Sequence, residues 1–236
     1  MIRLHFVVEG QAEETFVNEL LSKDLIPRDI FPSVRCVLTT DEGSHPAKGG
    51  GNRYRPWRKD ILRTLRSEKG RDVFLTTMID FYGLPQDFPG RDECSANGDP
   101  VAAVSCLEQR LRIDLGDDPR FIPYIQLHEY EALLFADPDV FPATFTQATP
   151  DQIQQLRQIR TSCSTVDEIN DGKTTAPSKR IIDVFPEYER NKPMLSALLA
   201  IDIGLERMST ASPHFRHWLE TLRNLRPLDH RNDATT

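Results

Sequence analysis

Short apolar runs and amphipathic helical patterns alternate over the first 137 residues, and this alternation constrains the fold more than any other feature of the chain. Runs typical of strands occur at residues 2–8, 33–39, 72–79 and 121–127. Patterns typical of helices lie between them, at residues 13–22, 57–67 and 101–113. Strands that alternate with helices usually pair in parallel. We therefore predict a parallel sheet with helices on its faces.

The second part of the chain differs from the first, since strand-like runs are absent after residue 137. Helical patterns dominate there, at residues 150–160, 178–185, 193–203 and 212–225. We predict an α/β core over residues 1–140 and a helical extension over residues 141–228 that packs on this core. Residues 229–236 are polar and are expected to fray.

The composition is typical of a folded, soluble protein. Hydrophobic residues make up 39% of the 236 residues, so a buried core is possible. No apolar stretch approaches the roughly 20 residues that span a bilayer, and the first apolar run is shorter than the core of a signal peptide. We expect a cytoplasmic protein that does not bind membranes.

The net charge of −7 argues against a protein that wraps nucleic acid over a broad basic surface. A nuclease remains possible, because a metal ion neutralises an acidic site and a local basic face can still hold phosphate.

The four cysteines are Cys36, Cys94, Cys106 and Cys163, and no two of them have the C-x-x-C spacing. A zinc site or a redox pair is therefore poorly supported, and a disulfide framework is implausible at this cysteine density. We expect buried or incidental thiols.

Three predicted strands end in a carboxylate, namely Glu9, Asp80 and Glu129. The carboxyl ends of parallel strands meet at the edge where α/β proteins bind ligands. Three ionised carboxylates there would repel one another unless a cation lay between them. Oxygen ligands of this kind suit Mg²⁺ or Mn²⁺, so we expect these three residues to bind one of these ions. The alternative for Asp80 is that it caps a turn.

Two further acids follow the strand ends closely. Glu13 lies one helical turn after Glu9 and could point back to the same place, or could simply favour the start of a helix. Glu131 follows Glu129 by two residues and is a candidate general base or outer ligand. His128 either orients a ligand or, as is more common, is a packed side chain.

Two groups of cations are candidates for contacts with phosphate. One group gathers on a single side of the predicted helix at residues 57–67 and just ahead of it: Arg55, Lys59, Arg63 and Arg66. Such a face would bind a phosphate backbone without reading its sequence, although most such faces are only solvated. The other group, Lys179 and Arg180, follows Pro177 at an expected helix start. These cations could hold a scissile phosphate or form a solvated helix end.

Four segments together resemble one protein family. They are Val-Glu-Gly-x-x-Glu at residues 8–13, Asp-x-Tyr-Gly-Leu-Pro at 80–85, His-Glu-Tyr-Glu-Ala-Leu-Leu-Phe at 128–135, and Asp171-Gly172 followed by Ala-Pro-Ser-Lys-Arg at 176–180. With this combination the chain resembles the uncharacterised bacterial DUF4276 proteins over nearly its whole length. That family is grouped with Toprim-like domains, the metal-binding fold of topoisomerases, primases and overcoming-lysogenization-defect nucleases.

The resemblance implies a Toprim/Rossmann-like parallel sheet flanked by helices, with Glu9 and Asp80 as metal ligands. A typical Toprim site carries Asp-x-Asp, whereas this chain has Asp-Phe-Tyr at residues 80–82, so Glu129 or Glu131 would have to compensate for the absent aspartate. The resemblance also implies phage-defence or mobile loci and a neighbouring ATPase, for which an ABC-type subunit is the candidate. A homo-oligomer is a further possibility.

The leading hypothesis is a metal-dependent phosphodiesterase that cleaves DNA or RNA, with Mg²⁺ or Mn²⁺ on the three strand-end acids. Glu13 or Glu131 would hold a second ion or deprotonate water, and Lys179 would stabilise the developing charge. The second hypothesis is a non-catalytic effector or regulatory subunit that binds a partner ATPase. The third is a structural domain whose carboxylates cap turns, which an absence of Mn²⁺ binding would favour.

Overall fold

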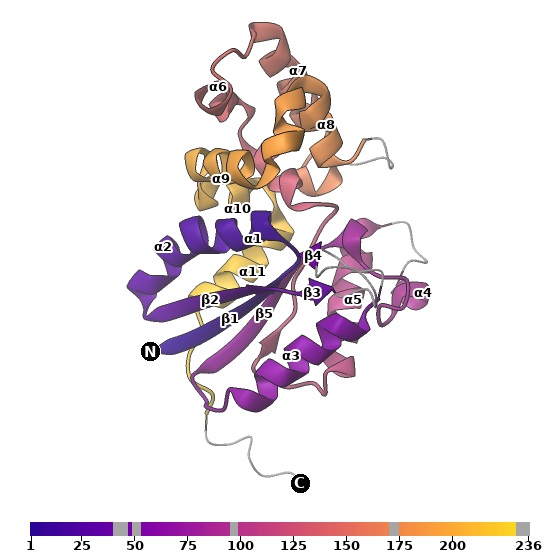
Figure 1. Ribbon diagram of the computed structural model, residues 1–236, viewed down its shortest axis with the longest axis vertical. Helices are drawn as coiled ribbons and strands as arrows, with labels where there is room; N and C mark the ends of the chain where they lie inside the picture. Colours follow the sequence, from indigo (N-terminus) through magenta and orange to yellow (C-terminus); the bar gives the residue numbers. More distant parts are fainter. Residues whose placement is uncertain (40–46, 49–52, 95–98, 170–174, 230–236) are drawn as a thin grey trace.

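The computed structural model describes residues 1–39, 47–48, 53–94, 99–169 and 175–229 (Figure 1). Most of the polar tail at 229–236, and Asp171-Gly172, therefore lie outside the described residues. The main sheet of the described part has five parallel strands in the order β2-β1-β5-β6, and β7 also pairs with β5. These strands are β1 (Ile2–Val8), β2 (Ile30–Cys36), β5 (Val73–Asp80), β6 (Phe121–Ile122) and β7 (Ile125–Gln126). The predicted parallel α/β sheet is thus confirmed.

The α-helices are α1 (Gln11–Phe16), α2 (Ser22–Leu25), α3 (Arg55–Ser67), α4 (Arg91–Cys94), α5 (Pro100–Asp114), α6 (Phe141–Thr144), α7 (Pro150–Thr161), α8 (Pro177–Val184), α9 (Lys192–Ile203), α10 (Leu205–Ala211) and α11 (Pro213–Arg223). Helices cover both faces of the sheet, whereas α6, α7 and α8 lie away from it at one end of the molecule (Figure 1). Within the described ranges, every helix is too short or too polar to traverse a bilayer.

Each face of the sheet has its own hydrophobic core. On one face, Val7 and Leu75 of the sheet pack with Trp57 of α3 and residues of α5. On the other face, Phe6 packs with α1, α9 and α11, and the indole of Trp218 donates a hydrogen bond to Thr76 Oγ1 at 2.9 Å. Because β5 is covered on both faces, residues 73–79 are all buried, and the hydroxyl groups of its two polar residues, Thr76 and Thr77, donate hydrogen bonds to backbone carbonyl oxygens.

Several predicted elements have different bounds in the structure. The second strand begins at Ile30 and ends at Cys36, three residues earlier than the predicted range at 33–39. The predicted strand at 121–127 consists of β6 and β7, and between them lies Pro123, which has no N–H to donate to a neighbouring strand. A minor antiparallel pair, β3 (Leu38–Thr39) with β4 (Ala47–Lys48), and helix α10 were not predicted.

The cysteine prediction is wrong for two of the four residues. Cys94 at the end of α4 and Cys106 in α5 form a disulfide, with their Cα atoms 5.6 Å apart. The two residues are 12 positions apart in the chain, and the packing of α4 against α5 brings them together. A search for C-x-x-C spacing cannot detect such a pair. Cys36 and Cys163 form no disulfide.

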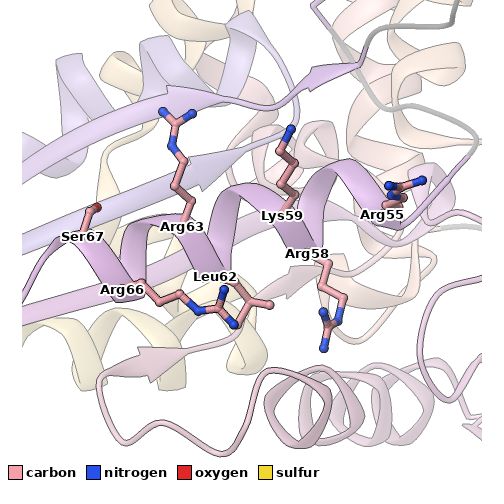
Figure 2. A pocket seen from close by; sticks show the side chains of 7 residues that line it. All are labelled: Arg55, Arg58, Lys59, Leu62, Arg63, Arg66 and Ser67. Atoms are coloured by element: carbon pink, nitrogen blue, oxygen red, sulfur yellow. The ribbon is translucent and has the colours of Figure 1, made fainter.

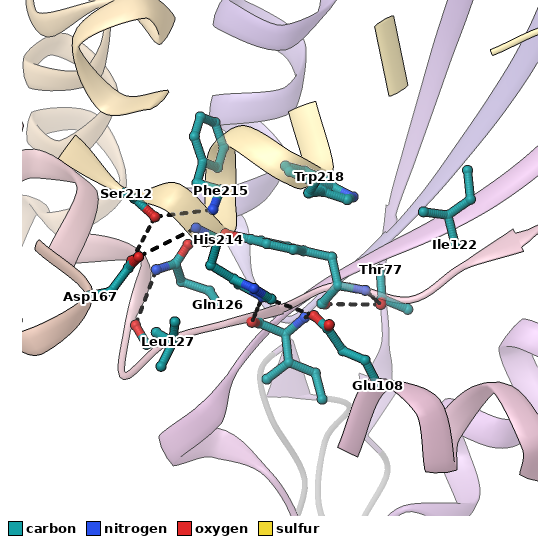
Figure 3. Close-up of polar contacts among 12 residues, drawn as sticks. Thr77, Glu108, Ile122, Gln126, Leu127, Asp167, Ser212, His214, Phe215 and Trp218 are labelled. Carbon is teal, nitrogen blue, oxygen red and sulfur yellow. Dashed lines mark hydrogen bonds and ion pairs between the residues drawn. The ribbon is translucent and has the colours of Figure 1, made fainter. Parts of the chain in front are cut away.

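A buried polar network connects α11 to the carboxyl edge of the sheet (Figure 3). Asp167, in the short helix Val166–Glu168, accepts hydrogen bonds from Ser212 Oγ at 2.6 Å and from the backbone N–H of His214 at 3.4 Å. The ring of His214 lies 3.0 Å from Glu108 Oε1 of α5. The carbonyl oxygen of Asp167 lies 2.8 Å from Nε2 of His128. The C-terminal helices therefore help to position the segment that follows β7.

Candidate metal centre

Glu9 and Asp80 follow two adjacent strands and lie together at the carboxyl edge of the sheet. Val8, the last residue of β1, is opposite Met78, so β5 continues two residues further and Asp80 lies one residue beyond the level of Glu9. The backbone N–H of Asp80 donates to Glu9 Oε2 at 3.2 Å. The Asp80 carboxylate accepts a hydrogen bond from the N–H of Tyr130 at 2.9 Å. These contacts link the ends of three segments that are far apart in the sequence.

Gly83 fixes the position of the Glu9 carboxylate. It ends the short 3-10 helix Phe81–Gly83 that directly follows Asp80. A β carbon on Gly83 would lie 2.5 and 2.6 Å from the two carboxylate oxygens of Glu9. Any side chain at this position would therefore displace Glu9, and only glycine permits the observed approach.

We expect Gly83→Ala to weaken Mn²⁺ binding by about 10-fold or more, because it moves a candidate ligand. The fold should survive, since only the end of one flexible side chain has to shift. Isothermal titration calorimetry with MnCl₂ measures the affinity, and thermal unfolding checks the fold. Gly116→Ala is the control for metal binding, because no atom lies within 4 Å of its would-be β carbon; its φ of 88° strains alanine, so this variant should lose stability but keep its Mn²⁺ affinity. Equal Mn²⁺ affinities for Gly83→Ala and the unchanged protein would contradict this role for Gly83.

The segment after β7 contributes the other strand-end acid. His128 has a φ of 61°, a left-handed conformation that L residues rarely adopt, so the chain turns sharply there. Glu129 follows, and its Oε2 accepts a hydrogen bond from the backbone N–H of Ser178 at 2.9 Å. Ser178 lies in the first turn of α8, where free N–H groups favour a carboxylate. Glu129 is thus held between the sheet edge and α8.

Glu131 is fully buried in the 3-10 helix Tyr130–Ala136, and its carboxylate oxygens have different surroundings. Oε1 accepts a hydrogen bond from the Tyr188 hydroxyl at 3.1 Å and lies 2.9 Å from Nζ of Lys192. Oε2 is buried and has no hydrogen-bond partner among the described residues. A buried carboxylate oxygen without a partner is costly, and a cation is the partner that would satisfy it best.

Lys192 was not predicted from the sequence, although it is the cation that faces these acids. It directly precedes Pro193 at the start of α9, whereas Lys179 follows Pro177 at the start of α8, so both lysines lie near a proline at a helix start. Lys179 itself is exposed on α8 and makes no hydrogen bond or ion pair with the described residues. Arg180 donates from Nε to the carbonyl oxygen of Thr175 at 2.8 Å.

An open pocket of about 580 Å³ exposes part of this cluster to solvent. Among the residues that the structure describes, residues 9–13, Asp80, Lys192 and Pro193 line this pocket. Glu13 belongs to this lining and is largely buried. Its Oε2 accepts a hydrogen bond from the N–H of Gly10 at 2.9 Å, so Glu13 also caps the start of α1. Both proposed orientations of Glu13 therefore hold at once: it caps the helix and it faces the pocket.

The electrostatics of the cluster disfavour ionised carboxylates. Burial raises the pKa of Asp80 well above its usual value, and Glu13, Glu9 and Glu131 raise it further by repulsion. Burial likewise raises the pKa of Glu9 and raises that of Glu13 to about 7. For Glu131, burial outweighs the attraction of Lys192, so its pKa is also raised. Burial alone would lower the pKa of Lys192, but the attraction of Glu131 raises it.

The donor set fits a hard divalent cation. Glu9, Glu13, Asp80, Glu129 and Glu131 interact with one another, and Lys192 supplies a single positive charge against them. All their donor atoms are oxygens, which Mg²⁺ and Mn²⁺ prefer. As the side chains stand, no group of three or more His, Cys, Asp or Glu within the described ranges could hold one ion. Backbone N–H groups occupy one oxygen each of Glu9, Asp80 and Glu129, so these carboxylates would have to turn to bind a cation.

The raised pKa of Glu13 predicts a loss of stability as pH increases in the absence of metal. Between the pKa of 4.5 expected for the unfolded chain and about 7 in the folded protein, the folded state holds more protons, so the free energy of unfolding falls. The shift corresponds to about 3 kcal/mol, and the loss is complete above about pH 7. Chemical unfolding in EDTA at a series of pH values measures it.

Glu13→Gln is the matched control for this titration, because it keeps the size of the side chain and removes its proton equilibrium. We expect a flatter pH profile for this variant, and Mn²⁺ should restore stability to the unchanged protein above pH 7. A profile that is the same with Glu and Gln at this position would show that Glu13 does not titrate abnormally.

Comparisons with known proteins were made for the whole chain. No curated protein matches the sequence. Among solved structures, the C-terminal region of the Xanthomonas campestris pv. campestris OLD protein aligns with 17% identity and a TM-score of 0.41, covering 94% of this chain and 95% of that chain. The profile of the family described as "Domain of unknown function (DUF4276)" matches residues 8–223. The match confirms the resemblance seen in the sequence motifs, and the chain belongs to the DUF4276 family.

Proposed function

We propose that this chain is a divalent-metal-dependent phosphodiesterase that acts on nucleic acid. The observation that carries the proposal is the convergence of Glu9, Asp80 and Glu131 from separate parts of the sequence on one region with a single lysine. Such an excess of buried negative charge is costly unless a cation neutralises it, and active sites are where proteins tolerate this cost. The family resemblance to Toprim-like domains supports phosphodiesters as the substrate class.

The roles of the side chains follow from their positions. Glu9 and Asp80 would hold the ion at the mouth of the pocket, with Glu129 as the third ligand. When bound, Mg²⁺ or Mn²⁺ supplies Lewis acidity toward phosphate and lowers the pKa of a coordinated water molecule. Glu13 faces the same pocket and is the candidate group to receive a proton from that water. Glu131 would orient Lys192, whose ammonium group can attract a phosphate oxygen.

The test is an assay of nucleic-acid cleavage by the purified chain. Supercoiled plasmid and labelled single-stranded DNA and RNA are incubated with Mn²⁺, with Mg²⁺ or with EDTA. We expect cleavage with at least one of the ions and none with EDTA. Arg157→Gln is the control variant and is expected to cleave like the unchanged protein. Arg157 is an exposed residue of α7 that pairs with Asp139. Intact substrates under every metal, with a folded protein, would contradict the proposal.

A non-catalytic effector or regulatory subunit is the second candidate function. Two observations favour it: the sequence lacks the second aspartate of Asp-x-Asp, and the described acids are not arranged to hold an ion as they stand. A partner that turned the carboxylates would complete the site. Co-expression with an ATPase encoded beside this chain tests it, because cleavage that appears only in the complex would favour this candidate over an enzyme active alone.

A further inference from the structure

The outer face of α3 carries four exposed cations, namely Arg55, Lys59, Arg63 and Arg66, which we call the α3 track (Figure 2). None of them forms an ion pair with another described residue, whereas the nearby Arg58 binds Asp114 with an Nε to Oδ2 distance of 2.8 Å. Acidic side chains outnumber basic ones in this chain, 36 to 29. These four cations, within 12 consecutive residues, are therefore a local concentration of positive charge that no ion pair with another described residue neutralises.

The spacing of the α3 track fits a chain of phosphates. Arg55, Lys59 and Arg63 are four residues apart, so each step advances about 6 Å along the helix axis. This distance is comparable with the separation of successive phosphates in an extended strand. Figure 2 shows the side chains of Lys59 and Arg63 extending to one side of the helix, and that of Arg66 extending to the other side, next to Leu62. The cations thus flank a shallow hollow whose surface is mostly apolar, formed by Leu62 and the methylene groups of the long side chains.

The track starts at the edge of the sheet that carries the acids. Just before α3, the N–H of Tyr54 donates to Asp87 Oδ1 at 2.8 Å, and its ring lies 5.3 Å from that of Phe88. Asp87 and Phe88 belong to the loop that follows Asp80. The far end of α3 lies at the opposite edge, where Arg120, just before β6, donates to the carbonyl oxygen of Leu65 at 2.9 Å. Figure 1 shows α3 lying along the sheet between these two edges.

We propose that the α3 track binds the sugar–phosphate backbone of one polynucleotide strand and guides it to the acidic pocket. About four successive phosphates would contact the track, with Arg55 nearest the pocket. Contacts of this kind position a strand without reading its bases, so the track has no sequence preference. The inference rests on the proposed function only for the cleavage that follows, because binding to the track requires no metal.

The experiment measures binding in EDTA, where no cleavage occurs. Fluorescence anisotropy follows the titration of fluorescein-labelled oligothymidylate and oligouridylate with the full chain at several salt concentrations. For a single strand, each phosphate contact contributes about 0.7 to the slope of log affinity against log salt, so four contacts contribute about 3. Replacing all four track residues by glutamine should lower the affinity by at least about 10-fold at low salt and reduce the slope by about 3.

The matched control removes the same number of charges elsewhere. Glutamine replaces Lys23, Arg112, Arg157 and Arg207, which lie on four other helices and have acidic partners. We expect this variant to bind like the unchanged protein. If both quadruple variants lose affinity equally, net charge explains binding and the track is overturned. The two labelled strands show whether DNA or RNA binds more tightly, and similar affinities are expected for backbone recognition.

A second assay separates this inference from the proposed function. The unchanged protein is tested with Mn²⁺ on bis(p-nitrophenyl) phosphate, which is too small to reach the track. If the protein hydrolyses this diester but the track variant still binds strands like the unchanged protein, the inference about the track is overturned and the proposed phosphodiesterase activity stands. Track-dependent strand binding without hydrolysis of any phosphodiester would support the track and contradict the phosphodiesterase.

Discussion

Asp80→Asn is expected to lower metal-dependent cleavage by at least about 10³-fold, because it removes a negative charge from the ion's position. Asparagine keeps an oxygen that can accept the hydrogen bond from the N–H of Tyr130, so the loss of activity would not result from the loss of this hydrogen bond. The initial rate of oligonucleotide cleavage in Mn²⁺ measures the effect. Asp139→Asn is the control and should keep full activity, because the side chain of Asp139 is exposed.

The same substitution should not destabilise the protein in EDTA. Burial and the neighbouring carboxylates raise the pKa of Asp80, so removal of its charge relieves repulsion above neutral pH. We expect a Tm equal to or higher than that of the unchanged protein, together with the loss of activity. An Asp80→Asn protein that cleaves at the normal rate would exclude Asp80 as a ligand, whereas one that unfolds would assign it a structural role.

Lys192→Met is expected to destabilise the protein by about 2 kcal/mol or more above neutral pH, because it leaves Glu131 buried without its counter-charge. The side chain of Glu131 is 1% exposed and that of Lys192 is 39% exposed, so solvent compensates for only part of the loss. The cost should shrink as the pH falls, since Glu131 becomes protonated. Urea unfolding at acidic and at slightly alkaline pH measures both values.

The double variant Lys192→Met/Glu131→Gln isolates the pair. Removing both charges should recover most of the stability that Lys192→Met loses, because no buried charge then remains unpaired. Recovery of stability without recovery of cleavage would fit a lysine that also acts on phosphate. Lys192→Met and Glu131→Gln are also measured as single variants. If their effects on stability simply add in the double variant, Lys192 and Glu131 do not interact, contrary to the 2.9 Å contact.

The parts of this fold that could be predicted are those with a local signature. The largely apolar run at residues 72–79 indicated a strand, and its end located Asp80. The apolar end of β1 located Glu9 in the same way, because parallel pairing brings strand ends to one edge. The amphipathic helical patterns at residues 57–67 and 212–225 indicated the helices α3 and α11, each with one buried face.

The parts that could not be predicted depend on contacts between distant segments. Lys192 reaches Glu131 only because α9 packs near the sheet edge, and no local pattern specifies that packing. Gly83 matters because of its distance from Glu9, which is 74 positions earlier in the chain. The disulfide between Cys94 and Cys106 depends on the packing of α4 against α5. Sequence patterns place residues on elements, whereas the partners of those residues follow from tertiary packing.

The central claim is that acids from separate strands share one divalent cation at the carboxyl edge of the sheet. A crystal of the protein soaked in MnCl₂, with data collected at the manganese absorption edge, tests it most directly. We predict an anomalous peak bonded to Glu9 and Asp80, with Glu129 or Glu131 turned toward it. An unoccupied edge in a crystal that binds Mn²⁺ elsewhere, or Glu9 and Asp80 bound to different ions, would contradict the claim.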